Sequence, residues 1–568
     1  MSTPGGLLLA LAVLLPFVGM LLGLVAGGRH VRRIAFVTIL VGLGIAIGIT
    51  WAWLQAGELE YLLGNWSPPL GIALRADGPA VAMLLAVAFV VGGIALYARA
   101  DFDTPVGSTE SRTAFTYWLL LLAVWGSLNL VFVSGDLFTL YVALELLTFA
   151  GVPLVCLAGS GETLRAALRY LLFALCGSVL YLLGAVLLYG GYGTLDMRLL
   201  AEVVQAEPIA WTALALMTVG LLAKTALFPL HIWLPPAHGG APAAASAVLS
   251  ALVIKGSWFL VLRLWCDVLP GVASPSAAQL LGGLGAAAIV VGSVVALRQQ
   301  RLKLLVAYST VAQIGYLFLM FPMALTDAGV YDGAVAAGVL QAISHATAKA
   351  GMFMAAGLVY AALGHDRIDD LAGAARALPI TVLAFVLGGV ALMGVLPSGA
   401  YLAKKLLLDA ADTSGQWLWT WVLQGGAVFT AGYVVLVLVR VLRRPTQPLA
   451  GLKPVSLLSQ WAALGLSLAS LALALTAVLG PLPASLISNP LSPKELGNTL
   501  AVLAIGTLLA WGLARRPLSG AGGGALRAAT QRLARGVEQG DHFIRRWPSA
   551  MVAMLGIAAC FGWLLVRA

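Results

Sequence analysis

The stretch LLAKTALFPLHIWLPPAHGGAP, residues 221–242, decides the fold. It begins as an apolar helix that carries a lysine, Lys224, in its middle. Pro229 then interrupts the helix, because a proline removes a helical hydrogen bond and clashes with the preceding turn. In a membrane, a broken helix with a charge beside the break is typical of a segment that lines a hydrated cavity. The alternative is a simple kink at a packing contact.

The composition places the chain in a membrane. Of its 568 residues, 61% are hydrophobic and 10% are charged, whereas soluble domains carry about 25% charged residues. Repeated apolar runs of bilayer length predict an all-α polytopic membrane protein, since the alternation typical of a β-barrel is missing from the sequence. The first run, residues 5–25, comes before its basic residues, the reverse of a signal peptide, so we expect it to be a membrane helix.

Sixteen membrane helices are predicted. With the N-terminus outside, the inner loops hold nearly all the loop Lys and Arg, and the outer loops hold only Arg75, Arg198, Lys494 and Arg567. We therefore expect a multi-pass protein of the cell inner membrane, whose net charge of +10 needs no nucleic-acid partner. The predicted spans are residues 5–26, 32–54, 78–98, 114–133, 136–157, 166–190, 209–229, 241–266, 277–297, 303–323, 333–362, 378–403, 417–441, 455–479, 496–514 and 549–566.

A linker, residues 517–547, joins the last two predicted helices. Its apolar residues recur with helical spacing and arginines fall elsewhere, which predicts an amphipathic helix on the inner surface. A basic, solvated loop is the alternative. The predicted apolar face consists of Ala525, Ala528, Ala529, Leu533 and Val537.

Several charged residues lie within the apolar runs, where an unpaired charge costs several kcal/mol. Glu145 is the one clearly central acid, and Asp136 lies nearer the surface. With so many lysines facing one carboxylate, we expect proton exchange among them, although each could be a structural pair or reach the interface. A sodium site would need several carboxylates and carbonyl oxygens. The basic residues are Lys224, Lys255, Arg263, His345, Lys349, Lys404 and Lys405.

A second interrupted helix precedes Lys404, in GGVALMGVLPSGAYLAKKLLL, residues 388–408. Gly394, Pro397 and Gly399 break it. We expect no metal or cofactor in this chain, because the four cysteines, Cys156, Cys176, Cys266 and Cys560, form no CxxC pair.

Two histidines follow the first break, and neither has cysteine or acidic neighbours in the sequence. We therefore expect no metal there. His238 is predicted to hydrogen-bond within the loop. His231 is predicted to lead protons from the inner surface to Lys224.

Six motifs together resemble the antiporter-like membrane subunits shared by respiratory complex I, membrane-bound hydrogenases and Mrp-type cation/proton antiporters, with N-, L- and Mrp D-like members nearest. The resemblance covers roughly residues 80–440. The motifs are DLFTLYVALE (136–145), KTALFPLHIWLPPAH (224–238), APAAASAVLSALVIK (241–255), LKLLVAYSTVAQIGY (302–316), AISHATAKAGMF (342–353) and LPSGAYLAK (396–404).

The resemblance implies a fourteen-helix core with two inverted five-helix repeats, each containing one broken helix, and about two extra C-terminal helices. The predicted divisions are residues 1–110 (helices 1–3), 111–270 (first repeat), 271–445 (second repeat), 446–516 (helices 14 and 15), 517–547 (inner-surface linker) and 548–568 (last helix).

The resemblance also implies roles for single residues. Glu145 and Lys224 would be the paired acid and lysine, Lys255 the central lysine, and Lys404 the exit lysine. His345 and Lys349 would form the relay on the eleventh helix, while His231, His238, Asp136 and Lys405 are candidates for proton uptake or gating. Pro236, Arg301 and Leu396 depart from the family pattern, and the first two put contacts with neighbouring subunits in doubt.

The leading functional hypothesis is a proton-translocating subunit of a multisubunit membrane complex. Any redox centres, of the NADH, ferredoxin or hydrogenase type, would lie in partner subunits. Alternatives are an Mrp-type subunit exchanging Na⁺ or K⁺ for protons, the membrane subunit of an inorganic-carbon uptake complex, and a structural subunit with an inactive relay. The coupled ion and the direction of flow are left open by the sequence.

Overall fold

The computed structural model describes residues 2–28, 30–103, 111–326, 329–444, 451–475, 493–513 and 524–567. The described chain is almost entirely helical, and 14 of its helices are long and apolar enough to cross a membrane. These are α1 (Leu7–Ala26), α2 (His30–Ala56), α3 (Gly78–Asp101), α4 (Arg112–Val133), α5 (Leu137–Val155), α6 (Gly161–Tyr192), α8 (Pro208–Thr225), Ala243–Val268, α12 (Pro275–Leu297), Leu302–Ala324, α15 (Asp332–Leu363), α19 (Trp417–Leu442), Leu457–Leu475 and α24 (Trp547–Val566).

Three of these spans are composed of several elements. Leu302–Ala324 is α13 (Leu302–Phe318) with α14 (Phe321–Ala324), and Leu457–Leu475 is α20 (Leu457–Ala472) with η5 (Leu473–Leu475). The span Ala243–Val268 contains two π-helical turns. Its elements are α10 (Ala243–Val248), η2 (Leu249–Val253), α11 (Ile254–Arg263) and η3 (Leu264–Val268).

The two predicted helix breaks are confirmed. After α8, Ala226 has a left-handed backbone (φ 60°), and the chain turns before the short helix α9 (Leu234–Gly240). The predicted helix 378–403 is α17 (Pro379–Leu392) and α18 (Gly399–Thr413), with Gly394 left-handed between them. Pro236 lies in the first turn of α9, where a missing N–H leaves no helical bond unmade.

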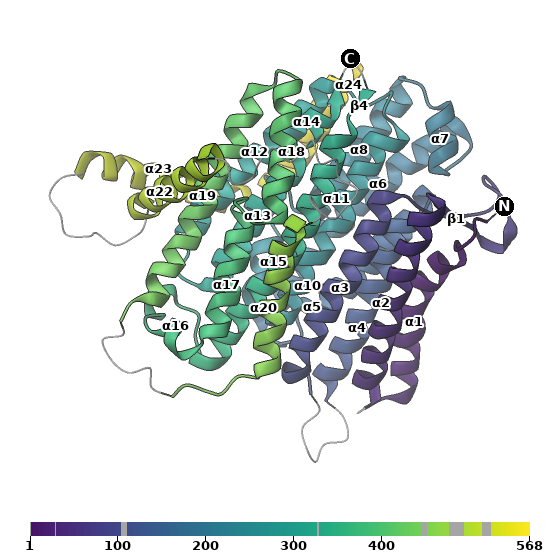
Figure 1. The fold of residues 1–568 in the computed structure, drawn as a ribbon. Coiled ribbons are helices and arrows are strands. Elements are labelled where there is room, and N and C mark those ends of the chain that lie inside the picture. Colours follow the sequence, from purple (N-terminus) through teal and green to yellow (C-terminus); the bar gives the residue numbers. More distant parts are fainter. Residues whose placement is uncertain are drawn as a thin grey trace.

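Two small hairpins and several short helices connect the spans. The strand β1 (Leu59–Leu62) pairs antiparallel with β2 (Ala73–Ala76) in the register Leu59↔Ala76. This hairpin, α7 and the N-terminus lie together at one end of the bundle (Figure 1). The other short elements are η1 (Leu63–Asn65), α7 (Met197–Val203), β3 (Leu325–Thr326), β4 (Gly329–Val330), η4 (Ile368–Asp370) and α16 (Ala374–Ala377).

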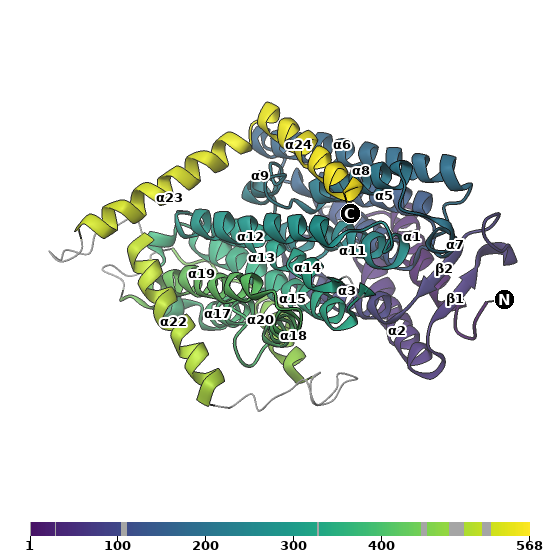
Figure 2. The same cartoon turned by 90° about the horizontal axis from the view of Figure 1, so that it is seen from above.

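The predicted helix 496–514 is present as α22 (Pro493–Leu513), but it does not run beside its neighbour. It crosses α19 (Figures 1 and 2), and Gly506 allows the crossing because a Cβ there would lie 2.6 Å from the Ala431 side chain. Hydropathy gives the length of a helix and not its direction, so the sequence could not distinguish these arrangements.

The predicted linker helix is present as α23 (Gly524–Ile544). Figure 2 shows it projecting from the bundle and joining it where α24 begins. On the predicted apolar face Leu533 is 73% exposed from the protein, whereas Ala534 and Asp541, which the prediction did not include, are buried. Arg29, Arg515, Arg516 and residues 517–523 lie outside the described residues.

Candidate functional site

A buried ion pair lies beside the first break. Lys224, on the last turn of α8, places its Nζ 3.3 Å from Oε1 of Glu145 on α5. The same ammonium donates to the Thr148 hydroxyl at 2.8 Å and to the Leu144 carbonyl at 3.4 Å. Ser178 on α6 donates to the Glu145 carboxylate. The pair predicted from the sequence is therefore in direct contact, and its oxygen partners come from α5.

Two glycines set the position of this pair. Where α6 meets α8, a Cβ on Gly220 would lie 2.3 Å from the Gly177 carbonyl oxygen, and one on Gly177 would lie 2.6 Å from the Gly220 oxygen. Small residues at such a crossing let two backbones approach closely. Gly177 precedes Ser178, and Lys224 lies one turn after Gly220, so the close crossing brings both side chains to Glu145.

A small cavity lies between Lys224 and the span Ala243–Val268. Its volume is about 10 Å³, close to what one water molecule occupies, and Thr148, Tyr170, Lys224 and Ser257 are among its lining residues. Ser257 lies on α11, two residues after Lys255. The cavity therefore connects the surroundings of the two lysines.

Lys255 is the second residue of α11, which follows the π-helical turn η2, a type of distortion frequent at functional sites. Its Nζ lies 2.7 Å from Nδ1 of His345 on α15 and 2.6 Å from the Ser250 carbonyl oxygen. Both side chains are fully buried. Either nitrogen can act as the donor, depending on the tautomer of His345.

Several hydroxyl groups lie between this pair and Lys349. The Ser250 hydroxyl lies 2.9 Å from that of Thr310 on α13. The adjacent residue, Ser309, accepts a hydrogen bond from Lys349, which also donates to the Val306 carbonyl at 3.1 Å. One helix, α13, therefore supplies the polar groups between the two lysines.

Further along α13, a side chain contacts the second break, which lies between α17 and α18. Gln313 on α13 donates to the Leu392 carbonyl oxygen, at the end of α17, at 3.2 Å. Beyond the break, Lys404 and Lys405 on α18 are partly exposed and line a cavity of about 50 Å³ with Asn498 of α22. Lys404 therefore lies at the edge of the bundle, unlike the buried lysines.

The uptake and gating candidates are dispersed. Asp136 caps α5, accepting from the Thr139 N–H at 2.7 Å, about 13 Å along the helix from Glu145. The His238 ring packs 4.7 Å from that of Phe353, and its nitrogens have no hydrogen-bond partner among the described residues, contrary to the prediction of a loop hydrogen bond. His231 is buried, and its Nε2 lies 2.7 Å from Oδ1 of Asp541.

Residues that the sequence did not indicate complete the site. The polar groups Thr148, Ser178, Ser250, Ser309 and Thr310 carry no charge that stands out from an apolar run. Asp541 lies 310 residues from its partner His231. Lys303, predicted to be a loop cation, donates to the Ala241 carbonyl at the start of α10. Arg301, a departure from the family pattern, pairs with Asp366 at 2.9 Å.

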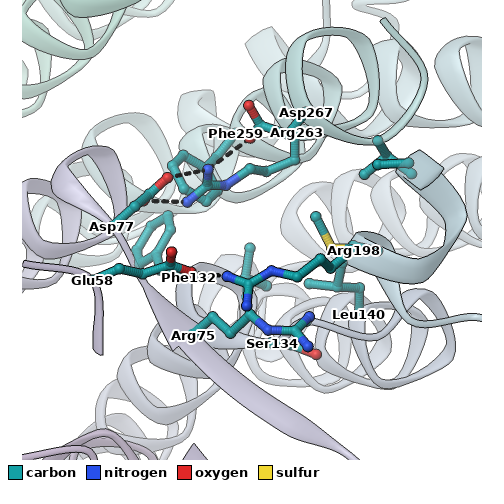
Figure 3. Close-up of a pocket in the computed structure, with 15 residues that line it drawn as sticks. Glu58, Arg75, Asp77, Phe132, Ser134, Leu140, Arg198, Phe259, Arg263 and Asp267 are labelled. Carbon is teal, nitrogen blue, oxygen red and sulfur yellow. Dashed lines mark hydrogen bonds and ion pairs between the residues drawn. The ribbon is translucent and has the colours of Figure 1, made fainter. Parts of the chain in front are cut away.

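A pocket of about 230 Å³ lies at the hairpin end of the bundle (Figure 3). There Arg263 binds both carboxylate oxygens of Asp77 at 2.5 Å and Asp267 at 2.7 Å, so it is held in ion pairs. Burial would raise the pKa of Asp77, but the hydrogen bonds and charge of Arg263 hold it below its usual value. No group of three or more His, Cys, Asp or Glu in the described ranges is placed to hold a metal ion.

Comparison with known proteins matches these elements to one family. A family profile described as "NADH:quinone oxidoreductase/Mrp antiporter, TM" matches residues 134–430, more than half of the chain. The chain belongs to this antiporter-like family. The match includes every residue from Glu145 to Lys404 described above and ends before α20, α22, α23 and α24.

Relatives of this antiporter-like protein are subunits of several kinds of membrane complex. It is 34% identical over 393 residues to the N subunit of the NADH-quinone oxidoreductase of Desulforudis audaxviator, covering 68% of this chain and 76% of the relative. It is 30% identical over 414 residues to the D subunit of the Na⁺/H⁺ antiporter of Alkalihalophilus pseudofirmus, covering 71% and 80%. A chain of the Mrp complex from a Dietzia species shares the fold, with a TM-score of 0.73 at 20% identity over 94% of this chain and 99% of that chain.

Proposed function

We propose that this antiporter-like subunit carries protons across the cell inner membrane through Glu145, Lys224, Lys255, His345, Lys349 and Lys404, as one member of a multisubunit complex. The observation that supports this most strongly is the row of buried basic groups in direct contact with proton acceptors. Lys224 contacts a carboxylate, Lys255 an imidazole, and Lys349 a hydroxyl. A structural role would be served as well by apolar residues, at lower desolvation cost.

The first step in this proposal is the separation of Glu145 from Lys224. In contact, the carboxylate holds the lysine in its charged form. When the two move apart, the ammonium loses that partner and releases a proton toward Lys255 by way of the small cavity between them. We place this movement at the break after Thr225, where the regular hydrogen bonds of α8 end.

The second step passes the proton along α13. The Lys255–His345 pair shares it, and the hydroxyls of Ser250, Thr310 and Ser309 lead to Lys349. From there the second break gives access to Lys404 at the edge of the bundle. We further propose, from the family resemblance, that residues 111–270 and 271–445 are inverted repeats and that the N-terminus is outside.

Protons fit this interior better than metal cations. A sodium or potassium ion needs several carboxylate or carbonyl oxygens, and the buried groups of the relay are mainly basic. The energy for transport would come from partner subunits, in keeping with relatives named as subunits of an NADH-quinone oxidoreductase and a Na⁺/H⁺ antiporter. If another ion is exchanged, we place its site outside this relay.

The test is proton flux in vesicles containing the complex that copurifies with this chain. Glu145→Gln and Lys224→Ala are expected to lower flux on the order of 100-fold, as for removal of a positioned proton-transfer group. Lys453→Ala, at an exposed lysine, is the control. Unchanged flux in an intact complex carrying Lys224→Ala would overturn the proposal and favour a structural subunit.

A further inference from the structure

The C-terminal helix α23 inserts a carboxylate into the bundle beside the first break. Asp541 is 1% exposed and contacts His231, which is 0% exposed, at 2.7 Å between Oδ1 and Nε2. The other carboxylate oxygen accepts from the Tyr308 hydroxyl at 3.0 Å and from Arg545 Nε at 2.9 Å. A buried carboxylate is costly unless its oxygens are hydrogen-bonded, and here both are.

The imidazole of His231 has two different sides. Its Nε2 faces Asp541, whereas its Nδ1 is buried and has no hydrogen-bond partner among the described residues. An imidazole held by a carboxylate at one nitrogen can bind a proton at the other, and the carboxylate then stabilises the imidazolium that forms. His231 lies seven residues beyond Lys224, within the break that follows α8.

We propose that Asp541 is the positioning residue that makes His231 a proton-loading group, so that α23 forms part of the transport site. In this step Nδ1 of His231 takes up one proton from the inner surface, and no bond between heavy atoms forms or breaks. The Asp541 carboxylate becomes the counter-ion of the imidazolium. The proton then leaves Nδ1 toward Lys224. This inference rests on the proposed proton transport.

Around the His231–Asp541 pair, Asp541 is the acidic group that contacts the imidazole. Besides His231, the titratable groups that contact Asp541 are Tyr308 from α13 and Arg545, just after α23. Arg545 in turn lies beside His542 of α23 and Arg169 of α6. The remaining acid nearby, Glu538, is held by Arg298 of α12 at 2.7 Å and does not contact the imidazole. Asp541 is therefore the carboxylate that compensates a charge on His231.

The test compares Asp541→Asn with Glu538→Gln in the intact complex, by proton flux as a function of pH. Without its counter-ion an imidazolium is less stable, so we expect the half-maximal flux of Asp541→Asn to move to lower pH, and flux above that point to fall about tenfold. Glu538→Gln removes the neighbouring ion pair that docks α23 and is expected to keep the original pH profile. Asp541→Glu is expected to restore the original half-point.

Three results would overturn the inference. The first is an unchanged pH profile in Asp541→Asn. The second is an equal shift in Glu538→Gln, which would make docking of α23 the whole effect. The third is an Asp541→Glu complex that assembles but whose pH of half-maximal proton flux differs from that of the original chain. This result also decides the question if Asp541→Asn fails to assemble. Lys224→Ala distinguishes failure of this inference from failure of the proposed function. Full flux in Lys224→Ala would contradict proton transport through this chain as a whole, whatever the role of Asp541.

Discussion

At the scale of single residues, the Lys224 ammonium has as many acceptors as it has hydrogens. Glu145, Thr148 and the Leu144 carbonyl supply them. An ammonium has three donors and no acceptor, so loss of one oxygen leaves a buried donor unsatisfied. Thr148 therefore contributes to the site although it does not titrate.

Thr148→Val tests this contribution with little change in shape. Leaving a charged donor unsatisfied costs about 1–3 kcal/mol, so we expect proton flux to fall roughly 5- to 100-fold while the complex still assembles. Thr212→Val is the matched control, because this exposed threonine on α8 bonds only its own helix at the Pro208 carbonyl. Equal flux in the two variants would show that the hydroxyl of Thr148 is dispensable.

The charged members of the site could be predicted from the sequence, and the hydroxyls could not. Glu145, Lys224 and Lys255 stand out because a charge within an apolar run is rare. Ser309 and Thr310 do not, because serine and threonine occur in membrane helices with their hydroxyls bonded to the preceding turn. Only the packing of α13 against α15 and η2 identifies these two hydroxyls as partners of Lys349 and Ser250.

At the scale of helices, the crossing of α6 and α8 determines the geometry of the ion pair. Gly220→Ala would place a Cβ 2.3 Å from a backbone oxygen and 3.0 Å from the Tyr181 backbone nitrogen. Backbone atoms cannot rotate away, so the two helices must separate.

We expect Gly220→Ala to lower the free energy of unfolding by about 1–3 kcal/mol and to reduce proton flux, since Lys224 and Ser178 would move relative to Glu145. Thermal unfolding in detergent and flux in vesicles measure the two effects. Gly190→Ala, on α6 where a Cβ meets nothing within 4 Å, is the control. If both variants unfold at the same temperature, the close approach of the α6 and α8 backbones is not needed for the stability of this crossing.

Helix existence was easier to predict than helix direction. The breaks at Pro229 and Pro397 follow from local backbone chemistry, and both are present. The transverse course of α22 and the docked face of α23 depend on surfaces of α19, α12 and α13 that are distant in sequence. The sequence could not show which residues of α23 dock on the bundle, and these include Glu538 and Asp541.

At the scale of the whole molecule, the C-terminal helices return to the first half of the chain. α24 packs against α8 and α12 (Figure 2), and the Trp547 ring lies 6.2 Å from that of Phe173 on α6. Asp541 lies just before this anchor. The end of the chain therefore contacts the elements that hold Lys224, although the family match stops at residue 430.

The docking of α23 is expected to depend on pH. Burial alone would raise the pKa of Asp541, but its hydrogen bond to His231 and the charges of His231 and Arg545 lower it below its ordinary value. A carboxyl whose pKa is lowered on folding stabilises the docked form above its unfolded pKa of about 4, and this contribution is lost as the pH falls through the docked value.

We therefore expect α23 to be protected from protease and hydrogen exchange near pH 6 and to become accessible as the solution is acidified below about pH 4. Asp541→Asn is expected to show less pH dependence over the same range. Protection that does not change between about pH 6 and pH 3 in the original chain would contradict this account.

The anchor formed by α24 makes the contact between Asp541 and His231 an intramolecular one. Only a few residues separate Asp541 from Trp547, so an undocked carboxylate stays within a short radius of its partner, and its effective concentration is set by this tether. Docking is then a unimolecular equilibrium that dilution of the protein cannot shift. A competing soluble acid would have to exceed that local concentration before it could occupy the same position beside His231.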